Sequence, residues 1–355
     1  MKLKKYVFKF YLSTDVTILN INEKERKSLN KDIMQICGSC DDINTWIYRD
    51  IKSGVFVREA HIKSVVPTEK KTEIVQITDV HLNYTDADDE ADEEVMYTKQ
   101  CRIWNADGVS VKALVNAMEY AKGCDRIVIT GDTLDYLTKG SMKLMQKYIW
   151  DVDPECIVTL GGHDITKQMQ TRRKDKLTLS QRQAIVQEFW KHDIFYSSEL
   201  LNDNVMIIQL DNSCGCYWES QILKLEKDLS TAREKGYTVL IFQHEAISTG
   251  RKEDKEYKSF YVWADCADTE NFYDNCIGGE NSDEPSMAVY KLITENADII
   301  RGLFCGHYHT SFYMEVEGSY LDKDGIRKRK TIPQYVLECN VYEGYTGHVL
   351  KITVE

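Results

Sequence analysis

The sequence predicts an α/β fold. Six short apolar runs rich in Val and Ile lie between Thr72 and the C-terminus, and amphipathic segments with helical spacing lie between them. Continuous apolar runs of this kind are typical of strands buried on both faces of a sheet that helices cover. The composition allows a full core, since 43% of the residues are hydrophobic and 29% are charged.

The expected elements can be placed in chain order. The strands have the sequences EIVQIT, RIVIT, CIVTL, VMIIQL, TVLIFQ and IIRGLFC. The helices have the sequences VKALVNAMEYA, LSQRQAIVQEFWK, ESQILKLEKDLSTAREKG and SMAVYKLITENA. In the third helix, Ile222, Leu225 and Leu229 form an apolar stripe, and Gly236 is placed to end the helix.

The first 70 residues have a different pattern. They contain strand-like KYVFKFYL, an apolar stripe with helical spacing at Leu29, Ile33 and Ile36, and a hairpin made of TWIYRD and VFVREAHI. We therefore expect residues 1–70 to form a small β-rich appendage that serves packing or oligomerisation, beside a main domain of residues 71–355. The sequence does not set the oligomeric state.

Composition limits the classes of partner. The formal net charge of −12 gives no general attraction to nucleic-acid phosphates. The chain has no run of about 18 apolar residues, and its N-terminus lacks the apolar core of a secretory signal. These features predict a soluble, cytoplasmic protein without a membrane partner. The odd number of cysteines, 11, favours free thiols over a disulfide framework.

Several segments have a structural and a functional interpretation. Cys37, Cys40, Cys214 and Cys216 would form a zinc site only if the two pairs met in space, and we expect unpaired thiols instead. The acidic insert 84–107 is expected to be a solvated loop rather than a calcium site. The aromatic insert 248–285 is long enough to be functional. Residues 318–332 predict a hairpin with a solvated basic tip.

Asp and His follow five of the six predicted strands. The strand ends read Asp79-Val-His81, Gly131-Asp132-Thr-Leu-Asp135, Gly161-Gly162-His163-Asp164, His244-Glu245 and Gly306-His307-Tyr-His309. The carboxyl ends of strands are where α/β sheets bind ligands. One such histidine would be structural more often than functional. Five of them at four strand ends need another reason, since burying imidazoles and carboxylates is costly unless they are paired or bound to metal.

The types of residue indicate a metal site. Asp and His are ligands for divalent ions such as Mn, Fe and Zn. In DVH and HYH the ligand-type residues are two apart, so on extended backbone they would project to the same side. The set is large enough for two adjacent ions, which form a clamp suited to phosphoryl displacement.

The ordered series DVH, GDTLD, GGHD, FQHE and GHYH resembles the calcineurin-like metallophosphoesterase family, whose pattern is D-x-H, G-D-x-x-D, G-N-H-D/E, H and G-H-x-H. The match runs from about Thr72 to the C-terminus and leaves residues 1–70 outside. The resemblance implies a β-sandwich of two mixed sheets flanked by helices, with two divalent metal ions (Mn, Fe or Zn) at the strand ends.

The resemblance also implies a role for each residue. One ion would be held by Asp79, His81, Asp132 and His309. Asp132 would bridge to the second ion, which His244 and His307 complete. His163 would act as general acid or stabilise charge, oriented by Asp164, while Asp135 would support the loop from behind. Capping of turns is an equally good interpretation of Asp135 and Asp164.

Gly162 departs from the family pattern, which has a metal-binding Asn at this position. Three interpretations stay open: a variant with a weak second metal site, a change that leaves a protein that only binds, or replacement of the missing ligand by a side chain from an insert.

The motifs together predict an activity. We expect a phosphoester hydrolase that acts on a small phosphomonoester or phosphodiester through a metal-bridging hydroxide. The alternative is a homologue that Gly162 has weakened or inactivated and that only binds metal or phosphate. A nuclease is less expected, because its sign would be a basic groove and only Arg172–Lys176 and Arg327–Lys330 are strongly basic.

Overall fold

The computed structural model describes residues 33–39, 45–50, 52–84, 109–165, 177–251, 276–279, 281–309, 311–341 and 347–355, with side chains from Asp50 onward. Most of the predicted inserts 84–107 and 248–285, and the basic segment 171–176, lie outside these ranges. Cys40 does as well, so the four-cysteine zinc site stays untested.

The first sheet has seven strands in the order β1-β2-β3-β13-β4-β5-β6. Its strands are β1 (Ile33–Ser39), β2 (Thr45–Asp50), β3 (Phe56–Ile62), β4 (Thr72–Ile77), β5 (Arg126–Thr130), β6 (Ile157–Thr159) and β13 (His348–Val354). β4, β5 and β6 run parallel to one another, whereas β13 is antiparallel to β4. The carboxyl ends of β4, β5 and β6 therefore lie at one edge.

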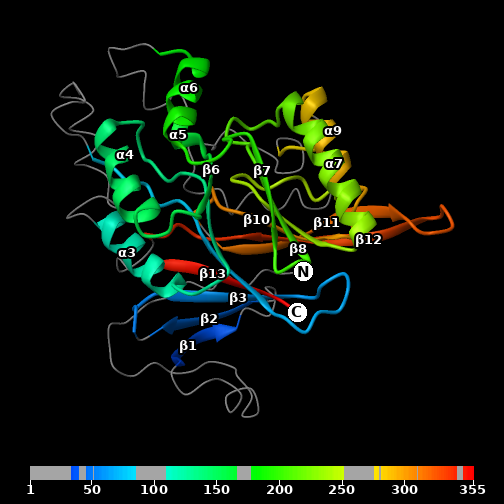
Figure 1. Cartoon of the computed structure of the whole chain (residues 1–355), viewed down its shortest axis with the longest axis horizontal. Coiled ribbons are helices and arrows are strands. Elements are labelled where there is room, and N and C mark those ends of the chain that lie inside the picture. The colour runs from blue at the N-terminus through cyan, green and yellow to red at the C-terminus, as the bar shows by residue number, and fades with distance from the viewer. Residues whose placement is uncertain are drawn as a thin grey trace.

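The second sheet has six strands in the order β11-β12-β10-β9-β8-β7. Its strands are β7 (Tyr196–Leu201), β8 (Val205–Leu210), β9 (Thr238–Phe242), β10 (Ile300–Cys305), β11 (Phe312–Leu321) and β12 (Arg327–Val336). β8, β9, β10 and β12 are parallel, and β7 and β11 pair antiparallel at the two edges. The long β11–β12 hairpin confirms the prediction for residues 318–332 and projects beyond the sheets (Figure 1).

Helices cover the outer face of each sheet (Figure 1). The described helices are α3 (Val109–Ala121), α4 (Lys139–Met145), η3 (Gln146–Trp150), α5 (Gly162–Ile165), α6 (Leu179–Phe189), α7 (Glu219–Lys235) and α9 (Glu284–Thr294). The first sheet packs against side chains of α3, η3 and α6, and the second against α7 and α9. Gly236 ends α7 with a φ of 73°, as predicted.

A third apolar cluster lies between the sheets and joins them into a sandwich. It includes Ile74 and Val128 from the first sheet, Leu240 and Phe304 from the second, and Ile352 from β13. The structure is thus a sandwich of two mixed sheets flanked by helices, as the resemblance implied. All six predicted strands are present, and β5, β8 and β9 are buried along their whole length.

The N-terminal strands continue the first sheet. The predicted hairpin is present as β2 and β3, and β3 pairs parallel with β13 over its whole length. The helical interpretation of Leu29, Ile33 and Ile36 was wrong for the last two residues, which lie in β1. Pairing with β2 outweighs a short helical periodicity there. The division into residues 1–70 and 71–355 stays a prediction.

Two further predictions can be compared with the described residues. No disulfide joins their cysteines. None of their helices is both long enough and apolar enough to cross a membrane.

Candidate metal centre

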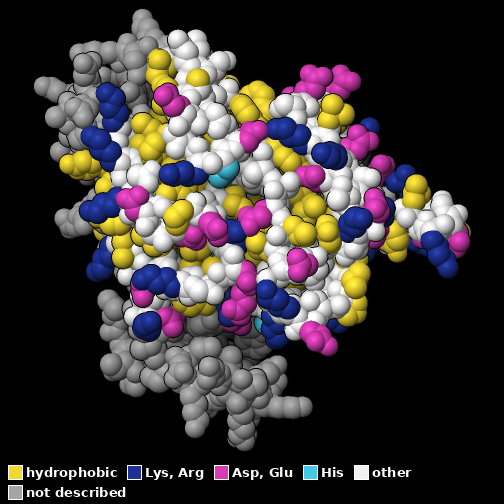
Figure 2. Space-filling view, viewed as in Figure 1, with side chains coloured by type: hydrophobic (Ala, Val, Ile, Leu, Met, Phe, Trp, Pro, Cys, Tyr) yellow, Lys and Arg dark blue, Asp and Glu magenta, His cyan; other side chains and the backbone are white. Residues whose placement is uncertain are grey.

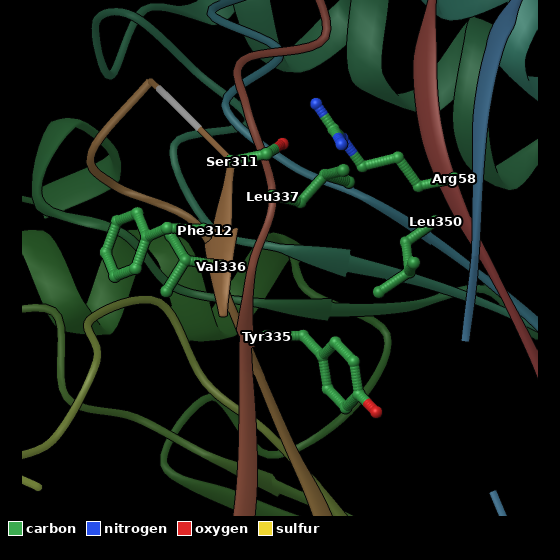
Figure 3. Close-up of a pocket in the computed structure, with 7 residues that line it drawn as sticks. All are labelled: Arg58, Ser311, Phe312, Tyr335, Val336, Leu337 and Leu350. Atoms are coloured by element: carbon green, nitrogen blue, oxygen red, sulfur yellow. The ribbon is translucent and has the colours of Figure 1, made fainter. Parts of the chain in front are cut away.

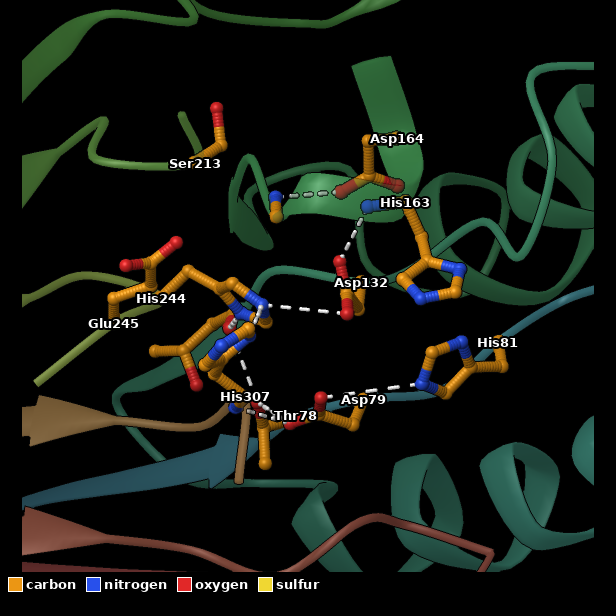
Figure 4. A network of polar contacts seen from close by, with 12 residues as sticks. Thr78, Asp79, His81, Asp132, His163, Asp164, Ser213, His244, Glu245 and His307 are labelled. Atoms are coloured by element: carbon orange, nitrogen blue, oxygen red, sulfur yellow. Dashed lines mark hydrogen bonds and ion pairs between the residues drawn. The ribbon is translucent and has the colours of Figure 1, made fainter. Parts of the chain in front are cut away.

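The polar strand ends of the two sheets face one another at one place (Figure 4). The residues that come together there are Asp79 and His81 after β4, Asp132 and Asp135 after β5, His163 in α5, His244 after β9, and His307 and His309 after β10. The first sheet contributes five of these residues and the second sheet three.

The first cluster consists of Asp79, His81, Asp132 and His309, whose ligand atoms all lie within 4.8 Å of one another. Nε2 of His81 lies 3.0 Å from Nε2 of His309, which is 3.2 Å from Oδ1 of Asp79. Three of the four side chains are buried, and His309 is 20% exposed. This is the set that the resemblance implies for the first ion.

The second cluster consists of Asp132, His244 and His307. Nε2 of His244 lies 3.3 Å from Oδ2 of Asp132 and 3.2 Å from Nδ1 of His307. Asp132 belongs to both clusters, so the two sites share one carboxylate. The set again matches the one that the resemblance implies, without the ligand that Asn would supply at position 162.

Hydrogen bonds behind the histidines show which ring nitrogens face the clusters. His244 Nδ1 lies 2.8 Å from the carbonyl of Thr130, which only accepts, so Nδ1 carries a hydrogen. His81 Nδ1 similarly lies 3.4 Å from Oδ1 of Asp135. Nε2 of each ring therefore faces carboxylate oxygens or other ring nitrogens, where it can bind a cation once any proton on it has left. A group of acceptors that face one another needs a cation between them, so these residues fit a metal.

The backbone at the site is strained. Among the described residues, non-glycine positions with positive φ are few, and five of them are here: Asp79 (50°), His81 (50°), Asp132 (48°), His307 (75°) and His309 (52°). The expectation that DVH and HYH have extended backbone was wrong. Left-handed turns, not pleated strand, aim these side chains inward, and such strain is retained where the surrounding structure enforces it.

Two glycines let the strand ends approach closely. A Cβ on Gly306 would lie 1.8 Å from Oγ1 of Thr78 and 2.4 Å from Oδ2 of Asp79. A Cβ on Gly161 would lie 2.3 Å from Oδ1 of Asp132. Both glycines therefore pack directly against candidate ligands, a position that no side chain could take without displacing the carboxylate.

The electrostatics of the site favour ionised carboxylates. Burial disfavours the charge on Asp79, but its bond with His309 outweighs burial and lowers the pKa to about 2. Burial likewise opposes ionisation of Asp132, yet the charge of His244 lowers its pKa well below the usual value. Burial and the charge of His244 lower the pKa of His307 to about 4. These groups offer lone pairs to a cation near neutral pH.

His163 lies beside the first cluster and is 24% exposed. Its Nδ1 lies 3.2 Å from Oδ1 of Asp135, and Asn83 donates to the other carboxylate oxygen at 2.6 Å. Asp135 therefore contacts the rings of both His163 and His81. The sequence-based roles of the two carboxylates are exchanged here, since Asp135 is the one placed to orient His163.

Asp164 has a structural position. Its carboxylate accepts hydrogen bonds from the backbone N–H groups of Leu134 and Gly161, both at 2.8 Å, and burial raises its pKa to about 7. It joins the loops that follow β5 and β6. The turn-capping interpretation of Asp164 fits these bonds better than the catalytic one.

The structure adds residues that motif reasoning missed. The side chain of Asn212 accepts from the backbone N–H groups of His244 and Glu245 and donates to the carbonyl of Glu245. Asn212 lies two residues after the end of β8. A polar residue at the end of the predicted strand VMIIQL was therefore the feature of the sequence that could have identified it. Cys339 donates to the carbonyl of Asp79 at 3.0 Å and lies near His81 and His309. No local motif marks it.

Comparison with known proteins adds little to this geometry. No protein-family model and no curated protein matches the chain. The solved structures that resemble it include two phosphatases. A dimetal phosphatase from Danio rerio is 14% identical over 79% of this chain and 91% of that one, with a TM-score of 0.42. A purple acid phosphatase from yellow lupin seeds is 12% identical over 87% of this chain and 48% of that one, with a TM-score of 0.41.

These likenesses are too distant to carry a function to this chain, so its function is inferred from the site. The order of the motifs along the chain, and the residues in each of the two clusters, are what the resemblance to calcineurin-like metallophosphoesterases implies.

Metal uptake by the second cluster is expected to depend on pH. Burial lowers the pKa of His244, but the adjacent Asp132 carboxylate outweighs burial and raises it to about 10. The raised pKa keeps His244 protonated near neutral pH until an ion displaces the proton. Affinity should then rise about tenfold per pH unit between about pH 6 and pH 8. Calorimetry in buffers of different ionisation enthalpy measures the released proton, and identical heats in all buffers would contradict its release.

Proposed function

We propose that this protein is a metal-dependent phosphoester hydrolase with two divalent ions. The observation that carries the proposal is the pair of donor clusters joined by Asp132, with His163 at their side. Asp79, His81, Asp132 and His309 would hold one ion, and Asp132, His244 and His307 the other. When bound, two such ions supply a hydroxide near neutral pH and neutralise charge on phosphate oxygens.

The chain's own residues position the reacting groups. Asp132 is fixed by the backbone N–H of His163, which donates to Oδ1 at 2.8 Å. That bond ties the loop carrying His163 to the shared carboxylate. Asp135 holds Nδ1 of His163, so that Nε2 is the nitrogen to give a proton to the leaving oxygen of a substrate. Buried side chains around the clusters limit the access of bulk water.

A small phosphomonoester or phosphodiester is the proposed substrate. Figure 2 shows one face of the molecule, on which acidic and basic side chains of the described residues are interspersed without a continuous basic area. The net charge of −12 also disfavours a long nucleic acid. Recognition of a single phosphate by two ions requires neither a basic groove nor a large surface.

Hydrolysis of an aryl phosphomonoester and an aryl phosphodiester with added Mn²⁺ tests this function. We expect turnover that disappears on chelation and returns with Mn²⁺. Absence of metal-dependent turnover of both substrates, in the natural chain and in the Gly162→Asn variant, would refute the proposal.

Gly162 favours a second candidate, a protein that binds metal or phosphate without turnover. The second cluster has three described donors, against four in the first. One ion or none per chain, together with tight phosphate binding and no turnover, would support the binding protein.

The variant Gly162→Asn is expected to tighten the second ion about tenfold and to raise the hydrolysis rate. An amide oxygen at this position would be a fourth donor, which reduces the dependence on water as a ligand. Mn²⁺ titration of both proteins measures the two affinities, with the first site as internal control. Unchanged metal content and rate would mean that another group already fills the position.

A further inference from the structure

The chain segment that follows β12 runs along the ends of β4 and β10, two strands that are followed by candidate metal ligands. The backbone N–H of Leu337 donates to the carbonyl of Cys305, and the N–H of Asn340 donates to the carbonyl of Thr78, both at 3.0 Å. The thiol of Cys339 donates to the carbonyl of Asp79. Residues 337–340 therefore connect the end of β4 to the end of β10, which belong to different sheets.

This connection lies directly behind the donor clusters. The thiol of Cys339 donates a hydrogen bond to the backbone carbonyl of Asp79. The backbone N–H of His307 donates to Oδ2 of the same residue at 2.9 Å. The spacing between Asp79 and the His307–His309 turn thus depends on where residues 337–340 lie.

A buried ion pair holds the connecting segment. Glu338 accepts from Nη2 of Arg58 at 3.2 Å and lies 2.8 Å from Nδ1 of His348. The side chains of Arg58 and Glu338 are only 13% and 12% exposed. Burial disfavours the charged carboxylate, but Arg58 and then His348 outweigh burial and lower its pKa. Charges this deeply buried are retained only when well paired.

Arg58 comes from the N-terminal part of the chain, whose role the motifs leave open. It lies in β3, opposite Leu350 of β13. Figure 3 shows its side chain extending from β3 toward Leu337 and Ser311, at the wall of a small pocket. Ser311 in turn accepts from the backbone N–H of Glu338 and lies two residues after His309.

We propose that Arg58 is a positioning residue for the metal centre, which makes β3 part of the machinery rather than an appendage to it. Through Glu338 it fixes residues 337–340, and through them the separation of Asp79 from the His307–His309 turn. The inference rests on the metal centre proposed above, but not on the substrate or on the reaction.

Mn²⁺ binding to the full chain, measured by competition with a fluorescent chelator, tests the proposal. Arg58→Met should weaken binding about tenfold, as is typical when a group that supports metal ligands is lost. Arg58→Lys should restore most of the affinity. The double variant Arg58→Met/Glu338→Gln removes the carboxylate that Arg58→Met alone would leave without its arginine. It should bind Mn²⁺ as weakly as Arg58→Met, but its unfolding temperature should be closer to that of the unchanged chain.

Arg126→Met is the matched control. Arg126 is also a mostly buried arginine of the first sheet, 9% exposed and paired with Glu155 and Glu199, but it lies at the start of β5, away from the clusters. The Arg126→Met substitution should lower the stability of the fold without changing the affinity for Mn²⁺. The positioning role of Arg58 would be overturned if both variants that contain Arg58→Met bound Mn²⁺ as tightly as the unchanged chain. It would also be overturned if Arg126→Met lost as much Mn²⁺ affinity as Arg58→Met. Neither result would affect the proposed metal centre itself. Failure of the natural chain to bind Mn²⁺ would overturn the metal centre and this role with it.

Discussion

Replacing Asp132 with Asn is expected to remove both metal ions and to lower phosphoester hydrolysis about a thousandfold. Asp132 is the one residue that belongs to both clusters, and its two oxygens have separate tasks. Oδ2 faces Nε2 of His244, while Oδ1 accepts from the backbone of His163. An amide is neutral, and its NH₂ group cannot replace a carboxylate oxygen at either position.

Metal content by elemental analysis and the rate with an aryl phosphate measure this effect. Asp211→Asn is the matched control. Asp211 is also fully buried, but it accepts from the backbone of Ser213 and from Nε1 of Trp218 and lies in neither cluster. Retention of two ions by Asp132→Asn would show that Asp132 is not the shared ligand. Loss of both ions in Asp211→Asn would show that removing any buried carboxylate in this region empties the site, and the assignment to Asp132 would then fail.

Replacing His163 with Asn is expected to lower the rate by about 10²–10⁴ while both ions stay bound. The ring is partly exposed beside the clusters and is held by Asp135, so it can act on the leaving oxygen without binding metal. The loss should be largest for alkyl phosphates, whose leaving oxygen needs a proton, and smallest for activated aryl phosphates.

Steady-state rates for a series of leaving groups, with metal content measured in parallel, test this role. His192→Asn is the control, because Nε2 of His192 accepts from the backbone N–H of Val158 in the middle of β6 and His192 belongs to neither cluster. A uniform loss across all leaving groups, or loss of an ion, would contradict proton donation by His163.

The local sequence was sufficient for the six strands and for the kinds of residue that end them. Runs such as RIVIT and TVLIFQ have continuous apolar centres, which is typical of strands buried on both faces, and the structure buries both strands along their whole length. The polar residues that end each run lie where parallel strands place ligands. Residue type and position thus predicted a metal site at this edge, the resemblance to the family implied which residues hold each ion, and the structure brings these residues into two clusters that share Asp132.

The orientation of these side chains could not be read from residue spacing. Extended backbone was expected in DVH and HYH. Instead, the first and last residues of both motifs (Asp79, His81, His307 and His309) have φ between 50° and 75°. Strain of this kind is imposed by surrounding packing, such as the contact of Gly306 with Thr78, which involves residues far apart in the chain. Likewise, the partner of His163 is Asp135, because Asp164 is used by two backbone N–H groups.

The sequence by itself determined the strands, the helices that cover them and the residue types at the strand ends, because periodicity and turn chemistry are local properties. Only the tertiary structure decided how β3 joins β13, how Glu338 pairs with Arg58 across 280 positions of the chain, and how that pair lies behind Asp79. Such contacts depend on the order of strands in a sheet, which is set by burial over the whole chain and leaves no signal at any one position.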